Sequence, residues 1–227
     1  MGNLDLNAFG AARLKLSATY PGVVPLPPSY KPIVGAVAGG IPSQIEYTLG
    51  IARLAHAAKD QRRKYTDEEY IVHPMEVATI LRTIDENPMT CGDINPVMAA
   101  LLHDTVEDTF VTLELLGRLF NPHVVRAVEW LTDKEWADPK PNRATRKEVD
   151  RQRIAAAPGW VQNVKVADLI SNTSTIAIHD PDFAKVYMKE KARVLDACTN
   201  AHPLLLEHAR IQIEAWELKQ MRASLKP

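Results

Sequence analysis

The chain has 227 residues, of which 46% are hydrophobic and 24% charged, and its formal net charge at pH 7 is −1. A chain of this length can bury enough surface to form one domain with its own core, without support from disulfides. The near-zero charge excludes a general attraction to nucleic acid or anionic membranes, and the longest apolar stretch, residues 33–41, is far shorter than the ~20 residues of a membrane-spanning helix.

Nothing in the sequence indicates export or lipidation. The first residues, MGNLDLNAFGAARLKL, lack the basic start and continuous apolar core of a signal peptide, and Leu6 stands where a myristoylation signal needs Ser or Thr. The two cysteines, Cys91 and Cys198, show no CxxC spacing and are too few for a disulfide scaffold. We therefore expect a soluble cytoplasmic protein with free thiols.

Residues 1–42 are predicted to form an irregular N-terminal arm, and residues 43–227 the folded domain. Repeated Pro and Gly in the second half of the arm remove backbone donors and break the periodicity of helix and strand. From residue 43 to 64 apolar residues recur at helical spacing instead, which predicts a helix. The residues expected to face the core from this helix are Ile45, Leu49 and Leu54.

Helical spacing continues along the rest of the chain. Pro in a first turn, or Asn or Thr at a cap, marks most of the helix starts, and Asn-Pro or Pro-Gly pairs mark several ends. The further helices are predicted at residues 74–84, 95–108, 113–120, 122–132, 146–157, 160–178, 182–199 and 203–223. Residues 133–145 are polar and contain Pro, so they are predicted to form a surface loop.

The predicted fold class is all-α. Residues 160–178 begin with a β-prone segment, but the spacing of Val164, Ala167 and Ile170 favours a helix. The sequence contains neither alternating strand pairs with hairpin turns nor an internal repeat.

The stretch LLHDTVEDT at residues 101–109 places His103, Asp104, Glu107 and Asp108 directly after an apolar run that is expected to be buried. On one continuous helix, at ~100° per residue, these four side chains share a face. Three carboxylates beside a buried run need a compensating cation, and a divalent metal is the most economical one. Because His103 and Asp104 supply only two ligands, further ligands are expected from other segments.

Two segments offer such ligands. His73, in EEYIVHPME, stands where a short extended run meets a helix that starts with Pro. Asp168, in VKVADLISNT, is a lone acid in an apolar run, which is costly to bury unless it is paired, and Asn172 follows one helical turn later. Either residue by itself would more often be packed or solvated, so the prediction of a metal site depends on the whole set.

The order of these residues resembles the ligand pattern of the HD phosphohydrolase superfamily, with one His, a His-Asp pair about thirty residues later and a distant Asp. The neighbouring sequences QRRK, YIVHP, AALLHDTVEDT and VADLISN are similar to the hydrolase domain of RelA/SpoT proteins and to the small alarmone hydrolases. The resemblance spans roughly residues 45–197 and implies an HD-domain helical bundle.

The resemblance also implies an activity, the removal of pyrophosphate from the ribose 3′ position of ppGpp and pppGpp, giving GDP or GTP. It implies one divalent metal, usually Mn²⁺, and a nucleotide as the small-molecule partner. The implied metal ligands are His73, His103, Asp104 and Asp168, the implied catalytic acids are Glu107 and Asp108, and the implied substrate contacts are Arg63, Lys64, Asn172, Thr175 and Tyr187.

Three positions depart from the family pattern. Leu169 and Ser174 stand where many relatives have basic residues, and Ala58 stands where many have His. These departures keep open an HD phosphohydrolase that acts on another nucleotide, such as ppApp, NADPH or a dNTP. A non-catalytic nucleotide-binding regulatory domain is a further alternative, which the intact Glu107-Asp108 pair disfavours. The sequence does not indicate the oligomeric state.

Overall fold

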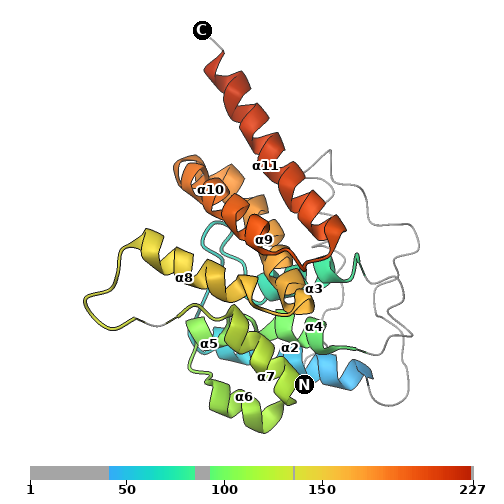
Figure 1. Cartoon of the computed structure of the whole chain (residues 1–227). Coiled ribbons are helices and arrows are strands. Elements are labelled where there is room, and N and C mark those ends of the chain that lie inside the picture. The colour runs from blue at the N-terminus through green and yellow to red at the C-terminus, as the bar shows by residue number, and fades with distance from the viewer. Residues whose placement is uncertain (1–40, 85–92, 135, 226–227) are drawn as a thin grey trace.

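The computed structural model describes residues 41–84, 93–134 and 136–225, which form a bundle of helices (Figure 1). Within these ranges the only extended pairing is a single antiparallel bridge between Arg62 and Glu69. The all-α prediction is therefore confirmed. The predicted arm lies outside the described residues except at its last two positions, and the domain boundary at residue 42 stays a prediction. Cys91 also lies outside them, whereas Cys198 is a buried free thiol.

The helix bounds follow the predicted order along the chain. They are α2 (Ile41–Ala57), α3 (Val72–Leu81), α4 (Asn95–Leu102), α5 (Thr105–Asp108), α6 (Leu113–Leu119), α7 (Pro122–Leu131), α8 (Arg143–Ala155), α9 (Gly159–His179), α10 (Pro181–Ala197) and α11 (Pro203–Ser224).

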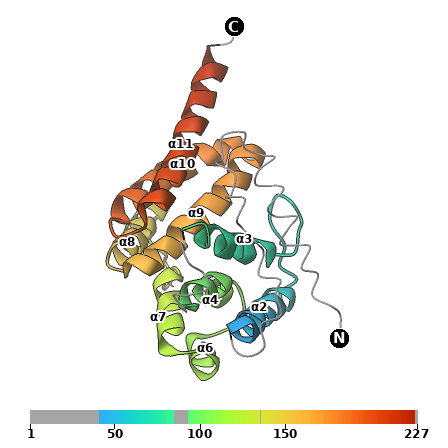
Figure 2. The same ribbon diagram turned by 90° about the vertical axis from the view of Figure 1, so that its right-hand side faces the viewer.

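Helix α9 runs through the middle of the bundle. It packs against α3, α4, α7, α8, α10 and α11, and Figure 2 shows α2, α4, α6 and α7 on one side of it and α10 and α11 on the other. Val161, Val164 and Ala167 are fully buried, as a central helix requires. The predicted helix at 160–178 is therefore confirmed, and α9 is the scaffold on which the other elements are placed.

Helix α4 forms the other part of the core that bears on function. Met98 through Leu102 are all buried, with Leu102 completely inaccessible to solvent. Burying a side chain of this size contributes ~1.5–3 kcal/mol, so this run firmly anchors the segment that follows it. The expectation that the run before His103 is buried is confirmed.

The predicted helix from 43 to 64 is wrong at its C-terminal end. Helix α2 ends at Ala57, and Asp60 adopts a left-handed conformation with φ of 49°, which Asp tolerates and which stops the helix. Leu54, predicted to face the core, is 70% exposed. The early end of α2 releases residues 58–71 as a loop that folds back across the bundle.

The predicted helix from 95 to 108 is interrupted. Helix α4 ends at Leu102, His103 and Asp104 form a turn, and the four-residue helix α5 follows. The four polar residues therefore do not share one face of a single helix, and the turn lets them point in different directions.

The remaining predicted helix ends differ by a few residues. Helix α3 already begins at Val72 and ends at Leu81, and α8 begins at Arg143 because Asn142 caps it by accepting a hydrogen bond from the Thr145 N–H. The predicted Thr112 cap of α6 is confirmed. None of the helices in the described part of the chain is both long and apolar enough to span a membrane.

Candidate metal and substrate site

Three helices bring His73, His103 and Asp168 together in the interior. His73 lies in the first turn of α3, His103 follows α4, and Asp168 lies in the buried middle of α9. One donor atom from each lies within 4.8 Å of the others, and all three residues are buried. The Nε2 atom of His73 is 3.2 Å from Asp168 Oδ1, and His103 Nε2 is 3.8 Å from the same oxygen.

Asp104 completes this cluster from the turn after α4. Its Oδ2 atom lies 3.1 Å from His103 Nε2 and 3.6 Å from His73 Nε2. The same oxygen accepts a hydrogen bond of 2.6 Å from the Tyr70 hydroxyl. The four residues predicted as metal ligands therefore lie around one point.

The other ring nitrogen of each histidine is held by a hydrogen bond. His103 Nδ1 lies 2.8 Å from the carbonyl oxygen of Ala100, which can only accept, so the proton is on Nδ1. His73 Nδ1 lies 2.9 Å from Ser171 Oγ, whose own proton goes to Glu76. Both histidines thus turn Nε2, the atom with which such a histidine binds a metal, into the cluster.

These residues fit a divalent cation. Among the described residues, His103 Nε2 is buried without a hydrogen-bond partner, and unpaired buried polar atoms are rare unless they have another function. Two imidazole nitrogens and carboxylate oxygens are a donor set that suits Mn²⁺ and other first-row divalent ions.

The charges of the cluster are strongly coupled. Burial opposes ionisation of Asp104 and Asp168, but His103 holds the pKa of the Asp104 carboxyl below its usual range, and Lys165 does the same for Asp168. Burial likewise opposes a charge on His103, but Asp104 and Asp168 raise its pKa to about 9. The site therefore holds both acids ionised and attracts a positive charge, which a metal ion can supply.

Lys165 is the cation that sequence reasoning missed. Its Nζ atom lies 2.9 Å from Asp168 Oδ2, while Asn172 Nδ2 donates a bond of 2.6 Å to the other oxygen. Burial disfavours the charge on Lys165, but Asp168 and Asp133 raise its pKa above the ordinary value. A spacing of three residues on a helix was the available signal, because it places Lys165 on the same face as Asp168.

The predicted catalytic acids lie beside the cluster but in different settings. Asp108 Oδ2 accepts a bond of 2.8 Å from Gln61 Nε2, and Gln61 Oε1 lies 2.7 Å from His56 Nδ1. Glu107 is exposed, and its Oε2 accepts a bond of 3.0 Å from the backbone N–H of Asp133. Gln61 stands in the QRRK motif, yet its contact with Asp108 could not be read from the sequence.

A cavity of about 200 Å³ opens next to His73. It lies between the loop after α2 and the C-terminal half of α9. Its lining consists of Arg63, Lys64, Tyr65, Tyr70, His73, Asn172, Thr175 and Ile176. Four of the five residues predicted to contact a substrate therefore line the same cavity.

The two basic residues of this lining, Arg63 and Lys64, differ in how far their side chains are exposed to solvent. Arg63 is 7% exposed, with its guanidinium 2.9 Å from Glu76 and 3.4 Å from the Thr175 hydroxyl. Lys64 is exposed and reaches Asp180 at 3.3 Å. Glu76 also accepts a bond from Ser171, so a continuous chain of contacts links Arg63 to the buried cluster.

Tyr187, the fifth predicted contact, is not among the residues that line the cavity. Its hydroxyl donates a bond of 3.2 Å to the carbonyl oxygen of Leu169, and its ring packs on the core. Leu169 and Ser174, which stand where many relatives have basic residues, are also absent from the cavity lining. Leu169 is buried, and the Ser174 hydroxyl donates to the Ser171 carbonyl.

Comparison with known proteins agrees with this geometry. Residues 49–193 match the HD domain family. The chain is similar to the guanosine-3′,5′-bis(diphosphate) 3′-pyrophosphohydrolase MESH1 of Danio rerio, with 38% identity over 51% of this chain and 62% of the relative. It is also similar to a protein of that enzyme name from Haemophilus influenzae, with 31% identity over 75% of this chain and 24% of the relative. The match thus covers only part of the length of each of these two relatives.

A solved structure shares the fold. It is described as a metazoan ortholog of SpoT that hydrolyzes ppGpp and plays a role in starvation responses. The TM-score is 0.66 at 26% sequence identity, and the match covers 79% of this chain and 98% of that one.

Proposed function

The chain belongs to the HD domain family, and we propose that it is a metal-dependent hydrolase that removes the 3′-pyrophosphate from ppGpp and pppGpp. The products are GDP or GTP and pyrophosphate. The observation that supports this most strongly is that the His73, His103 and Asp168 cluster adjoins a cavity lined by Arg63 and Lys64. Metal-binding donors next to fixed positive charge are what hydrolysis of a phosphate ester needs.

The proposed cofactor is one divalent cation, Mn²⁺ in the first instance. Its ligands are His73, His103, Asp104 and Asp168. When bound, such an ion acts as a Lewis acid toward a phosphoryl oxygen. The hydrogen bonds to Nδ1 of each histidine keep the rings in the binding orientation before the ion arrives, which lowers the cost of binding it.

The proposed reaction adds water across the bond between phosphorus and the ribose 3′ oxygen. The hydroxyl group stays on the released pyrophosphate, and a proton passes to the ribose oxygen. Asp108 is the proposed group that orients the water and accepts its proton, because Gln61 engages only its Oδ2 atom. Glu107, tied to the backbone of Asp133, is proposed to assist from the exposed side.

The proposed substrate contacts lie along the wall of the cavity. Lys64 is exposed and can turn toward a phosphate group, whereas Arg63 is fixed by Glu76 and offers its remaining guanidinium N–H groups. Tyr65 stacks on His179, with ring centroids 5.8 Å apart, and presents an aromatic surface to the nucleoside. Asn172 and Thr175 supply polar groups on the α9 side.

The direct test is turnover of purified protein with Mn²⁺ and ppGpp, followed by pppGpp, ppApp and NADPH. Release of GDP and pyrophosphate is expected from ppGpp, with loss of activity in Asp104→Ala. Asp182→Ala is a matched control, since that side chain is 93% exposed and lies outside the cluster. Inertness of the metal-loaded protein toward ppGpp and pppGpp would refute the proposed activity.

A different nucleotide is the second candidate. The observation that favours it is that Leu169 and Ser174 provide no positive charge where many relatives have a basic residue. Hydrolysis of ppApp or NADPH in place of ppGpp would keep the metal site and change the substrate. Metal binding without turnover of any nucleotide would favour a regulatory binding domain. The proposal places the protein in the cytoplasm, with a nucleotide as its partner.

A further inference from the structure

The C-terminal half of α11 extends beyond the other helices (Figures 1 and 2). The side of this half that faces away from the bundle is apolar, with Ile211, Leu218 and Leu225 exposed by 48%, 53% and 77%. These three residues repeat every seven positions, which is the spacing of a helix that pairs with another helix. On the opposite side of α11, Ile213 and Trp216 are half-buried, so the exposed stripe is not the side that holds α11 to the bundle.

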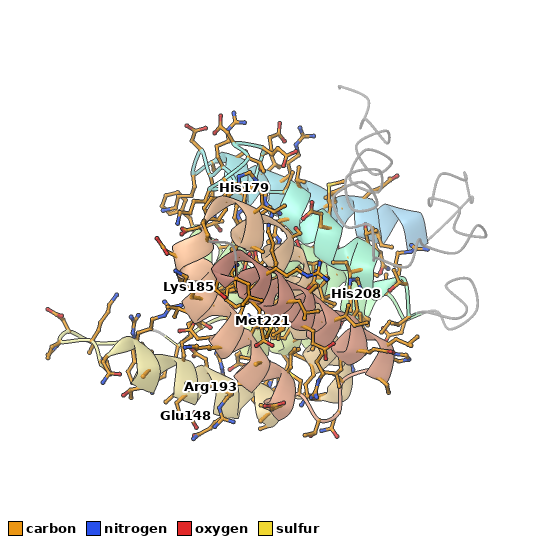
Figure 3. All side chains as sticks on the ribbon, turned by 90° about the horizontal axis from the view of Figure 1, so that it is seen from above. Glu148, His179, Lys185, Arg193, His208 and Met221 are labelled. Carbon is orange, nitrogen blue, oxygen red and sulfur yellow. The ribbon has the colours of Figure 1, made fainter. Side chains whose placement is uncertain are left out.

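Two further exposed apolar residues widen the stripe. They are Ala215 and Met221, and Met221 is 59% exposed and is labelled in Figure 3. At ~100° per residue, the five apolar side chains between residues 211 and 225 fall within an arc of ~120°. Exposed apolar side chains that gather on one face of a helix indicate a contact surface.

The charges inside this stripe indicate what covers it. Glu214 and Arg222 lie four residues before and four residues after Leu218, and both are exposed. Neither forms an ion pair with another residue in the part of the chain that the structure describes. The stripe therefore carries opposite charges at equal distances from its centre. When an identical helix lies antiparallel to it, each charge meets the opposite charge.

We propose that this stripe pairs with the same stripe of a second copy of the chain, with the two α11 helices antiparallel and the two Leu218 side chains in contact at the centre. In this register Glu214 lies level with Arg222 of the second copy, at both ends of the contact. Ile211 lies level with Leu225 of the second copy. Every apolar and charged group of the stripe then meets a suitable partner.

A parallel pair is disfavoured by the same charges. With Leu218 again at the centre, Glu214 would lie level with Glu214 of the second copy, and Arg222 level with Arg222. Like charges held at one level along a helix pair are destabilising, whereas the antiparallel register converts both contacts into ion pairs.

The size of the contact sets its expected strength. Residues 211–225 make about four helical turns, which span ~21 Å. Such a pair is shorter than a long coiled coil and below the area of standard permanent interfaces, so a reversible dimer is expected. We expect the mass measured by light scattering to rise from one copy toward two between ~1 and ~100 µM protein, a range that corresponds to micromolar dissociation.

The first experiment compares Leu218→Glu with Ala223→Glu in the full chain. Both substitutions add one negative charge to the same helix, but residue 223 lies well away from Leu218 around the helix axis, at ~140°. Leu218→Glu is expected to keep the protein as a single copy at all these concentrations, and Ala223→Glu to leave the dimer intact. A parent protein that stays a single copy throughout, or equal effects of the two substitutions, would overturn the proposal.

The second experiment tests the register. Glu214→Arg places two arginines level with each other at both ends of the antiparallel pair. Because two attractive contacts then become repulsive, the dimer is expected to weaken at least ~5-fold, which corresponds to ~1 kcal/mol. Adding Arg222→Glu to this variant restores opposite charges and is expected to restore the parent affinity. In a parallel pair the second substitution cannot rescue the first, so absence of rescue would exclude the antiparallel register.

Both experiments use protein without nucleotide, and their result does not depend on hydrolysis. Helical content measured by circular dichroism confirms that each variant is folded. The residues of the stripe lie outside the proposed active site, so each variant is expected to keep the activity of the parent protein.

Discussion

His73 Nε2 lies 3.2 Å from Asp168 Oδ1, although the two residues belong to different helices and are far apart in the sequence. The contact exists because α3 packs directly along α9. An imidazole nitrogen and a carboxylate oxygen that meet at one buried point supply two donors of the proposed metal site, and His103 and Asp104 supply two more.

Replacing Asp168 by Asn should remove the metal. The substitution preserves the shape of the side chain but removes the charge that the buried donors share, and it leaves Lys165 without its ion pair. We expect bound Mn²⁺, measured by elemental analysis after dialysis, to fall below one tenth of the parent content. Asp196→Asn, on the exposed side of α10, should leave the content unchanged. Parent-level Mn²⁺ in the Asp168 variant would contradict the assigned ligand set.

Replacing Gln61 by Leu should slow catalysis without removing the metal. Gln61 Nε2 holds Asp108 Oδ2 at 2.8 Å, and loss of this bond lets the carboxylate leave the orientation proposed for proton transfer. We expect kcat to fall ~10–100-fold, the size of effect found for residues that orient catalytic groups, while Mn²⁺ affinity is retained. An unchanged kcat would show that Asp108 does not depend on this contact.

Replacing Lys64 by Ala should weaken substrate binding more than it slows the reaction. Lys64 is exposed at the rim of the cavity, where its Nζ atom contacts Asp180 and Tyr65 and not the proposed metal ligands that the structure describes. We expect KM for ppGpp to rise ~5–10-fold, which corresponds to the loss of one partly solvated charge-assisted bond, with kcat within ~2-fold of the parent value. Lys185→Ala, which removes another exposed lysine, is the control. An effect on kcat alone would place Lys64 in the chemical step.

Lys191 should make stability depend on pH. Its side chain is 1% exposed, and among the described residues its Nζ atom bonds only to the neutral Thr173 and Gln212. Burial lowers its pKa to about 7, whereas its unfolded pKa is near the ordinary 10.5. Between these values the unfolded chain binds more protons than the folded one, so this group makes the free energy of unfolding rise with pH.

Chemical unfolding at several pH values measures this effect. Lys191→Met keeps a long apolar side chain without the charge, so the rise between pH ~7 and ~10 should become shallower. The exposed Lys189→Met on the same helix should leave it unchanged. Burial and Lys191 both lower the pKa of His208 from its ordinary value. Equal slopes for the parent and Lys191→Met would contradict the prediction.

Gly159 should tolerate no side chain. A Cβ atom at this position would lie 2.4 Å from the backbone oxygen of Asn200, a contact that only a shift of the backbone can relieve. We expect Gly159→Ala to lower the free energy of unfolding by about 1–3 kcal/mol, as overpacking does. Gly117, on α6, has open space around it, so Gly117→Ala should raise the free energy by about 0.5–1 kcal/mol instead. Denaturant unfolding of both variants checks the contrast.

Sequence patterns were enough to predict the fold class and the residues of the buried His-Asp cluster. Helical spacing identified the long helices because a buried face must repeat with the period of the helix, and α9 shows this even where its first residues favour strand. The motif that contains His103 and Asp104, together with His73 and Asp168, indicated a metal site because buried acids need a compensating charge. The same residues carried the resemblance to the family that the comparison established.

The positions of the side chains around the site follow from how the helices pack, which the sequence patterns do not show. The break after Leu102 and the early end of α2 are local changes, but they are stabilised by packing between segments that the spacing of one segment cannot reveal. Tyr70 donates a hydrogen bond to Asp104, and Lys165 donates one to Asp168. Gln61 donates one to Asp108, which is far from it in the sequence. Such contacts depend on where helices cross, and crossing positions are set by side-chain packing, not by the periodicity of any single helix.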